Sequence, residues 1–116
     1  MAVRSFRDLI VWQKSMDFVV WTYNATAGLP YYERFGLASQ LQRAAVSIPS
    51  NIAEGSRRRS PRDFKHFCNF AHGSAAEAET QLLIVERIYP RVDISAGLEL
   101  LTEIQKILSV LTRPTN

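Results

Sequence analysis

The chain has 116 residues, of which 47% are hydrophobic and 22% are charged, and its formal net charge is +3. This length and balance predict one globular domain, residues 1–116, with a core of its own, and they exclude a disordered chain. Charged residues interrupt the N-terminal stretch between Arg4 and Lys14. We therefore expect neither a signal peptide nor a membrane span, and a cytoplasmic location.

The charge is distributed unevenly along the chain. Residues 1–76 carry ten basic and five acidic side chains, whereas residues 77–116 carry four basic and six acidic ones. A dipolar surface of this kind favours the approach of a polyanion to one end of the molecule.

The first helix is predicted over residues 6–27, with Ser5 as its N-cap and Gly28, in a left-handed conformation, at its end. Its inner face is predicted to contain Leu9, Trp12, Met16, Val19 and Tyr23. A second apolar set on the opposite face comprises Val11, Phe18 and Trp21. One core cannot contain both faces of a single helix in so short a chain, so we assign the second set to a contact between subunits.

The second helix is predicted over residues 33–54, with Gly55 as its terminator. Its inner face is predicted to contain Leu37, Leu41, Ala44, Ala45, Ile48 and Ile52. Pro49 lies inside this pattern and removes one backbone hydrogen bond, so we expect a kink there. The alternative is a break, with a new helix starting at Pro49.

The third helix is predicted over residues 61–89, because Ser60 is a good N-cap and Pro61 a good first residue. The connection at 56–61 is short, so helices two and three should be antiparallel. The inner stripe is predicted to contain Phe64, Phe67, Ala71, Ser74, Ala78, Leu82, Val85 and Tyr89. A second stripe contains Phe70, Gly73, Glu77, Thr80, Ile84 and Ile88, and we assign its apolar members and Gly73 to subunit contacts.

A fourth helix is predicted over residues 95–112, and its inner face is predicted to contain Leu98, Leu101, Ile104, Leu108 and Leu111. No strand alternation or internal repeat is present. Four amphipathic helices joined by short turns predict an all-α, antiparallel up-down-up-down four-helix bundle.

No residue pattern specifies a reaction. Metal sites in bundles use Glu-x-x-His, which this chain lacks, so we expect no metal, no cofactor and no catalytic residue. Cys68 is the only cysteine, and its apolar setting predicts a small buried hydrophobe. A metal-free ribonuclease of the HEPN type would use an arginine and a nearby histidine, and the spacing of Arg59 or Arg62 to His66 allows this less favoured alternative.

A basic cluster surrounds the connection between helices two and three. It consists of Arg57, Arg58, Arg59, Arg62 and Lys65. Cations beside a helix N-terminus can bind phosphates. The alternative is a solvated turn whose cations pair with Glu54 and Asp63.

A polar set lies on the facing ends of helices two and three, where simple packing would place apolar residues. It consists of Asn51, Glu54, Ser74, Glu77 and Thr80. Buried polar groups need partners, so we expect this set to form a hydrogen-bond network that fixes the register of the helices or subunits, with a ligand site as the alternative.

Three segments carry a family resemblance. RAAVSIPSNIAEG (residues 43–55), FCNFAHGSAAEAETQL (67–82) and FRDLIVWQKSMDF (6–18) resemble bacterial four-helix bundle proteins of the S23, or 23S rRNA intervening-sequence protein, family. Ala76 and Ala78 stand where that family more often has leucine. The resemblance implies a cytoplasmic bacterial protein that assembles as a ring-shaped homopentamer. It also implies similarity to the accessory variability protein of diversity-generating retroelements, which works beside a reverse transcriptase and binds nucleic acid.

Residues and resemblance together predict a non-enzymatic homo-oligomer that binds RNA or another nucleic acid through its basic turns. A protein-interaction scaffold that binds no nucleic acid is the alternative. The family has no established activity, so the resemblance implies no catalytic residue.

Overall fold

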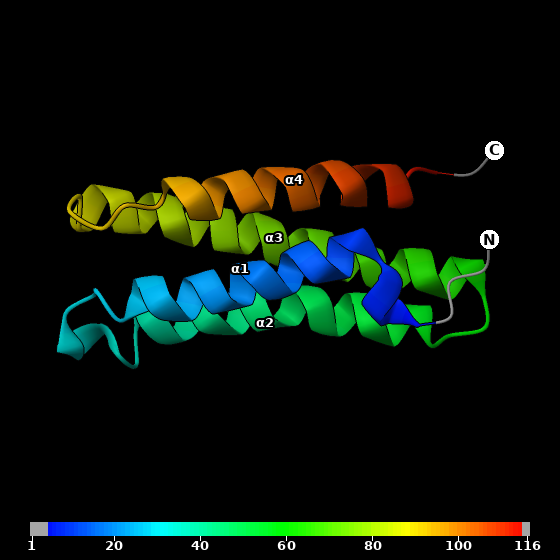
Figure 1. Cartoon of the computed structure of the whole chain (residues 1–116), viewed down its shortest axis with the longest axis horizontal. Helices are drawn as coiled ribbons and strands as arrows, with labels where there is room; N and C mark the ends of the chain where they lie inside the picture. Colours follow the sequence, from blue (N-terminus) through cyan, green and yellow to red (C-terminus); the bar gives the residue numbers. More distant parts are fainter. Residues whose placement is uncertain (1–4, 115–116) are drawn as a thin grey trace.

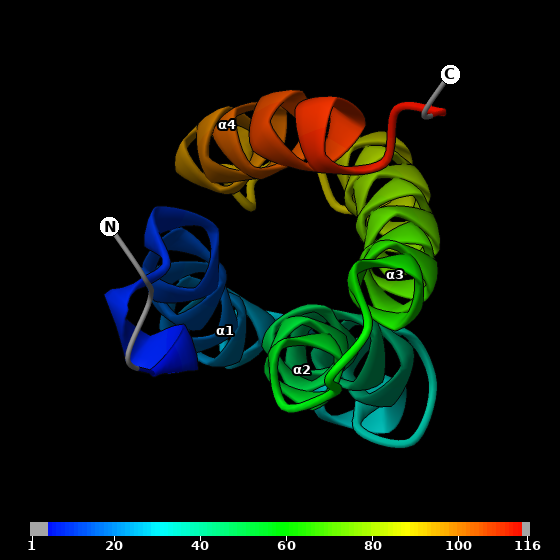
Figure 2. The ribbon, with the colours of Figure 1, turned by 90° about the vertical axis from the view of Figure 1, so that its right-hand side faces the viewer.

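The structure is a computed structural model that describes residues 5–114. It contains four antiparallel helices, namely α1 (Ile10–Thr26), α2 (Leu37–Ser56), α3 (Pro61–Ile88) and α4 (Ser95–Leu111). Each helix packs against the next, and α4 packs against α1, which closes a bundle of 45 by 25 by 21 Å (Figures 1 and 2). No strand occurs among residues 5–114. The predicted all-α four-helix bundle is confirmed.

Two short 3₁₀ helices precede α1 and α2, where longer α-helices were predicted. They are η1 (Phe6–Asp8) and η2 (Tyr31–Glu33). Leu9 is extended, with ψ of 124°, and separates η1 from α1. Ser5 caps η1, not α1, by accepting a hydrogen bond from the amide of Arg7 at 3.2 Å. The predicted starts of the first two helices were therefore wrong by a few residues.

The predicted inner face of α1 is only partly correct: Leu9, Trp12 and Val19 are half-buried against the core, but the most buried residues of the helix lie on the face that was predicted to be outer. Val11 and Phe18 are 2% and 0% exposed, so they belong to the core and cannot contact another subunit. Met16 and Tyr23, predicted to face inward, are 39% and 50% exposed. Trp21 lies across α4, where its ring occupies the space in which a Cβ on Gly97 would stand.

Polar side chains on the buried face of α1 explain this error. Ser15, Thr22 and Thr26 are buried, and each hydroxyl donates a hydrogen bond to the carbonyl four residues earlier, at 2.6 to 2.9 Å. A hydroxyl satisfied by its own helix can be buried at little cost. The periodicity of apolar residues alone therefore pointed to the wrong face.

The inner faces of α2 and α3 follow the prediction more closely. Leu41, Ile48 and Ile52 are fully buried, as are Ala71, Ala78 and Leu82 of α3. The helix α2 continues through Pro49, so the alternative of a break at this residue does not occur. Gly28 was predicted to end the first helix in a left-handed conformation and Gly55 to end the second helix, but no glycine of residues 5–114 has positive φ. Gly55 lies inside the last turn of α2.

The helices differ in length, and this difference exposes one end of the bundle. At 1.5 Å per residue, the 28 residues of α3 span about 42 Å, whereas the 17 residues of α4 span about 26 Å. In Figure 1, α4 ends before the α2–α3 turn is reached, and η1 lies beside that turn instead. Among residues 5–114, the α2–α3 turn is thus covered by η1 and not by a complete bundle.

No helix in the described part of the chain is both long enough and apolar enough to cross a membrane.

Candidate nucleic-acid interface

The α2–α3 turn, Arg57 to Ser60, is held tightly by the helices on either side. A Cβ on Gly55 would lie 2.8 Å from the Cβ of Phe67 and 3.2 Å from the carbonyl oxygen of Phe64, so only glycine allows the two helices to approach this closely. Ser60 accepts hydrogen bonds from the amides of Arg62 and Asp63, at 3.1 and 3.3 Å, and thereby begins α3. The three arginines of the turn are therefore fixed at the end of the bundle, and all three are exposed.

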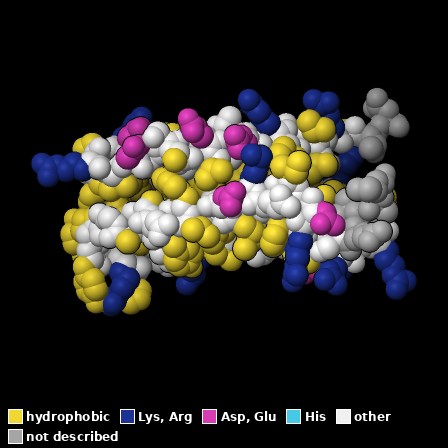
Figure 3. Space-filling model, viewed as in Figure 1, with side chains coloured by type: hydrophobic (Ala, Val, Ile, Leu, Met, Phe, Trp, Pro, Cys, Tyr) yellow, Lys and Arg dark blue, Asp and Glu magenta, His cyan; other side chains and the backbone are white. Residues whose placement is uncertain are grey.

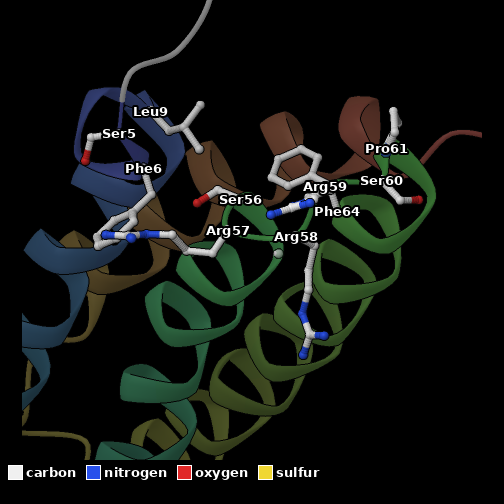
Figure 4. Close-up of a pocket in the computed structure, with 11 residues that line it drawn as sticks. Ser5, Phe6, Leu9, Ser56, Arg57, Arg58, Arg59, Ser60, Pro61 and Phe64 are labelled. Atoms are coloured by element: carbon white, nitrogen blue, oxygen red, sulfur yellow. The ribbon is translucent and has the colours of Figure 1, made fainter.

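The three arginines point in different directions (Figure 4). The guanidinium of Arg57 lies over the ring of Phe6, 5.5 Å from its centroid. Arg59 lies on the same side of the turn as Arg57. Arg58 extends away from them along α3, where its guanidinium lies 4.9 Å from the ring of Phe67 and its Nε lies 3.6 Å from a carboxylate oxygen of Glu54.

The charge on this turn is mostly unneutralised. Within residues 5–114, Arg58 is the only member of the basic cluster with a carboxylate within 4.0 Å. Asp63 pairs with none of the five, so the alternative of a fully paired, solvated turn holds only for Arg58 and Glu54. Arg62 is exposed and Lys65 half-buried on the first turns of α3. Four of the five cations are therefore available to an anion.

A pocket of about 570 Å³ lies between η1 and the α2–α3 turn. Phe6 and Leu9 form one side, and Phe64 and Pro61 of α3 form the other, with Ser56 between them (Figure 4). The edge of the Phe6 ring packs against Trp12, with 5.3 Å between ring centroids. Sequence reasoning missed Phe6 and Leu9 as site residues, because nothing in their local pattern shows that η1 folds against a turn some fifty residues later.

The predicted polar network forms only in part. The hydroxyls of Ser47 and Ser74 lie 2.7 Å apart across α2 and α3, and Asn51 donates to the carbonyl and hydroxyl oxygens of Ser47 at 2.9 and 3.0 Å. Ser47, which the sequence analysis did not select, is therefore the centre of the network.

The other three predicted members lie outside this network. Glu54 contacts Arg58, and Thr80 donates to the carbonyl of Ala76 in its own helix. Glu77 is exposed and makes no side-chain hydrogen bond to any described residue. These three point to solvent, so they have no need of a buried partner.

The second stripe of α3 is exposed, as predicted. Phe70, Ile84 and Ile88 are 52%, 39% and 55% exposed. A Cβ on Gly73 would have no heavy atom within 4 Å, so no described segment of the chain packs closely against this glycine. This stripe remains available to a second copy, whereas Val11 and Phe18 are buried and Trp21 is half-buried against Gly97 of α4.

The histidine of the ribonuclease alternative lies apart from the pocket. His66 packs against Phe70, with 4.6 Å between ring centroids, and does not line the pocket that contains Arg59. The structure therefore gives the pair Arg59 and His66 no shared site. Among residues 5–114, no group of three or more His, Cys, Asp or Glu residues is placed to hold a metal ion.

Cys68 is fully buried on α3, as predicted. Burial disfavours the thiolate and raises the pKa of this thiol to about 11. The thiol is therefore inert at neutral pH.

Bundle and turn together define the class: an all-α four-helix protein with a cationic, aromatic-lined end and an unpaired apolar stripe on its longest helix. The chain belongs to the 23S rRNA-intervening sequence protein family, whose model matches residues 7–113. A crystal structure from Bacteroides thetaiotaomicron, described as a protein with unknown function from the S23 ribosomal protein family, is 27% identical, with a TM-score of 0.79 over 90% of this chain and 100% of that chain. No curated protein matches the sequence. The family resemblance of the three segments is thus confirmed.

Proposed function

We propose that this protein is a non-enzymatic, cytoplasmic homo-oligomer that binds RNA through its arginine turn. The observation that carries the proposal is the pair of exposed guanidiniums, Arg57 and Arg59, with no carboxylate within 4.0 Å among the described residues. Such groups bind phosphates and release counterions without reading sequence. The family name refers to 23S rRNA, which makes RNA the first nucleic acid to test.

Self-association is the second part of the proposal. The exposed stripe of α3, with Phe70, Ile84 and Ile88 around the open position of Gly73, supports a contact with another copy. We propose a ring-shaped homopentamer, as the family resemblance implies. Such a ring would repeat the arginine turn at each subunit, so several weak phosphate contacts would act together.

RNA binding is tested on protein purified at low salt without nuclease. We expect it to retain RNA, and a plot of log affinity against log salt concentration to have a slope of about −2 for three contacts per subunit to a single strand. Salt-insensitive capture of a protein with no nucleic acid would instead support the scaffold. RNA cleavage that His66→Ala abolishes would support the ribonuclease.

Oligomerisation is tested by light scattering. We expect a mass near five times the chain mass of 13.2 kDa, and Ile88→Glu should reduce it because a charge would enter the apolar contact. Val110→Glu on α4 is a matched control, since Val110 and Ile88 are both 55% exposed. A monomeric parent protein, or equal effects of the two variants, would contradict the assignment of the stripe.

A further inference from the structure

The pocket beside the arginine turn has more structure than the binding of phosphates requires. Phosphate groups on the outside of a duplex need only exposed cations. Here all three arginines of the turn border a recess whose walls include the half-buried Phe6, Leu9 and Phe64. Apolar and aromatic walls beside guanidiniums suit a ligand with a flat, apolar ring attached to an anion.

A nucleotide with an unpaired base has this chemistry. Bases released from a helical stack pack on aromatic rings and on the planes of arginine guanidiniums, whereas paired bases have their faces covered by their neighbours. The guanidinium of Arg57 and the ring of Phe6 already lie 5.5 Å apart and offer both kinds of surface at one place. The volume of about 570 Å³ is within the range of small-molecule sites.

The walls of the pocket are held in place without a ligand. Trp12 packs against Phe6 from α1. Ser5 caps η1, and the side chain of Gln13 donates to the carbonyl of Arg7 at 2.8 Å. A site whose walls are already fixed loses little conformational entropy when it binds.

We propose that this pocket binds one unpaired nucleotide of an RNA, with its base against Phe6 and Arg57 and its phosphate at Arg59. This proposal rests on the proposed RNA binding and states which form of RNA the site selects. The positive charge of the turn favours the phosphodiester, and the apolar walls favour the base. RNA with a bulge, loop or single-stranded end therefore binds more tightly than a continuous duplex.

Arg57 and Arg58 are neighbours in the sequence, but their side chains point in different directions, so the same substitution at each gives a matched pair of variants. Arg57→Lys keeps the charge but removes the planar group that stacks on a base. Arg58→Lys makes the same change one residue later. Arg58 also lines the pocket, but its guanidinium extends away from Arg57 along α3, beside the ring of Phe67. Phe6→Leu removes the aromatic ring and keeps the apolar wall.

The test measures, by fluorescence anisotropy, the affinity for a blunt RNA duplex and for the same duplex with one bulged nucleotide. The parent protein is expected to bind the bulged duplex about tenfold more tightly, the range that stacking of one base supports. Arg57→Lys and Phe6→Leu should remove this preference, because each lowers the affinity for the bulged duplex more than the affinity for the blunt duplex, whereas Arg58→Lys should retain the preference. Circular dichroism and light scattering confirm that each variant keeps its fold and mass.

Three results would overturn the proposal. One is equal binding of the two duplexes by the parent protein, which leaves RNA binding itself intact. Another is a preference that survives in both Arg57→Lys and Phe6→Leu. The third is competition by polyglutamate that matches single-stranded RNA at equal charge concentration, since the site would then select charge and no base. Failure of the parent protein to bind either duplex would instead reject the proposed function.

Discussion

Both ends of the bundle combine exposed cations with aromatic rings, but they arrange them in opposite ways. At the α2–α3 end, Phe6 and Phe64 are half-buried walls of a pocket, and Arg57 and Arg59 have no acidic partner among the described residues. At the other end, which contains η2 and the α3–α4 turn, the aromatic rings themselves are on the surface (Figure 3).

At that second end the cation is already engaged. The guanidinium of Arg34 lies between the rings of Tyr31 and Phe35, 4.3 and 4.5 Å from their centroids, and these rings are 74% and 83% exposed. The hydroxyl of Tyr89 donates to the carboxylate of Glu33. Similar residue types thus form a recess with half-buried rings beside Arg57 at one end, and exposed rings around Arg34 at the other.

Charge reversal should produce the largest difference between the two ends, measured as the loss of affinity for RNA. The variant Arg57→Glu, Arg58→Glu, Arg59→Glu should bind RNA about 100-fold more weakly, because each replacement removes a phosphate contact and adds repulsion. Arg34→Glu, Arg87→Glu and Arg91→Glu change the net charge equally at the other end, and should reduce affinity by less than about fivefold through the long-range field alone. Anisotropy at one salt concentration measures both, and equal losses would show that only net charge matters.

Glycine replacement should also distinguish the two ends. Gly55→Ala places a Cβ 2.8 Å from that of Phe67, so α2 and α3 must separate at the turn, and we expect a loss of about 2 kcal/mol in the free energy of unfolding. At the other end, the nearest atom to a Cβ on Gly28 would be the carbonyl oxygen of Ala25 at 3.3 Å. Gly28→Ala should change stability by less than about 1 kcal/mol. Urea denaturation measures both variants, and a milder effect of Gly55→Ala would mean that the turn is not tightly held.

The first amides of α3 and α4 donate to side chains of different chemistry: the hydroxyl of Ser60, which is the N-cap of α3, and the carboxylate of Asp93, which precedes the N-cap of α4. Ser60→Ala should lower stability by about 1 kcal/mol at any pH, because the cap of α3 is an uncharged hydroxyl. Hydrogen bonds from the side chain and amide of Ser95 hold the pKa of Asp93 below its ordinary value of 3.8. A lowered pKa means that the carboxylate stabilises the fold above the unfolded-state pKa and that this contribution is lost as the pH falls through the folded-state value.

Asp93→Asn should therefore be less stable than the parent at neutral pH, and this difference should shrink at acid pH. The Ser60→Ala difference should stay constant over the same range. Thermal unfolding monitored by circular dichroism measures both, and parallel pH profiles for the two variants would contradict the assignment.

The smallest expected effect concerns Tyr89. Its hydrogen bond to Glu33, and then its contact with Tyr32, raise its pKa above the ordinary value of 10.0. The protonated phenol is favoured in the folded state, so the stabilisation is complete below the unfolded-state pKa and is lost as the pH rises beyond it. Tyr89→Phe should lower the melting temperature at neutral pH and bring it closer to that of the parent in strong alkali. Variants at the α2–α3 end should show no such dependence of the melting temperature on alkaline pH. If the melting temperatures of Tyr89→Phe and the parent differ by the same amount at every pH, Tyr89 acts only through packing.

Local patterns were sufficient for most of the architecture. Ser60 followed by Pro61 predicted the start of α3, and the apolar residues of α2 predicted its buried face, because these signals act within a few residues of the backbone they control. The three consecutive arginines were also visible directly. That they lie on a tight turn followed from the short connection.

Faces and sites depended on the packing of distant segments. The buried side of α1 contains hydroxyl groups that donate hydrogen bonds to carbonyls of their own helix and can therefore lie in the core. A pattern of apolar residues alone does not identify such a face. The pocket exists because η1 folds against a turn that α4 is too short to cover, and the directions of Arg57 and Arg58 follow from the rings of Phe6 and Phe67 beside them. The identities of the cations are thus a property of the chain, whereas their arrangement around a recess is a property of the fold.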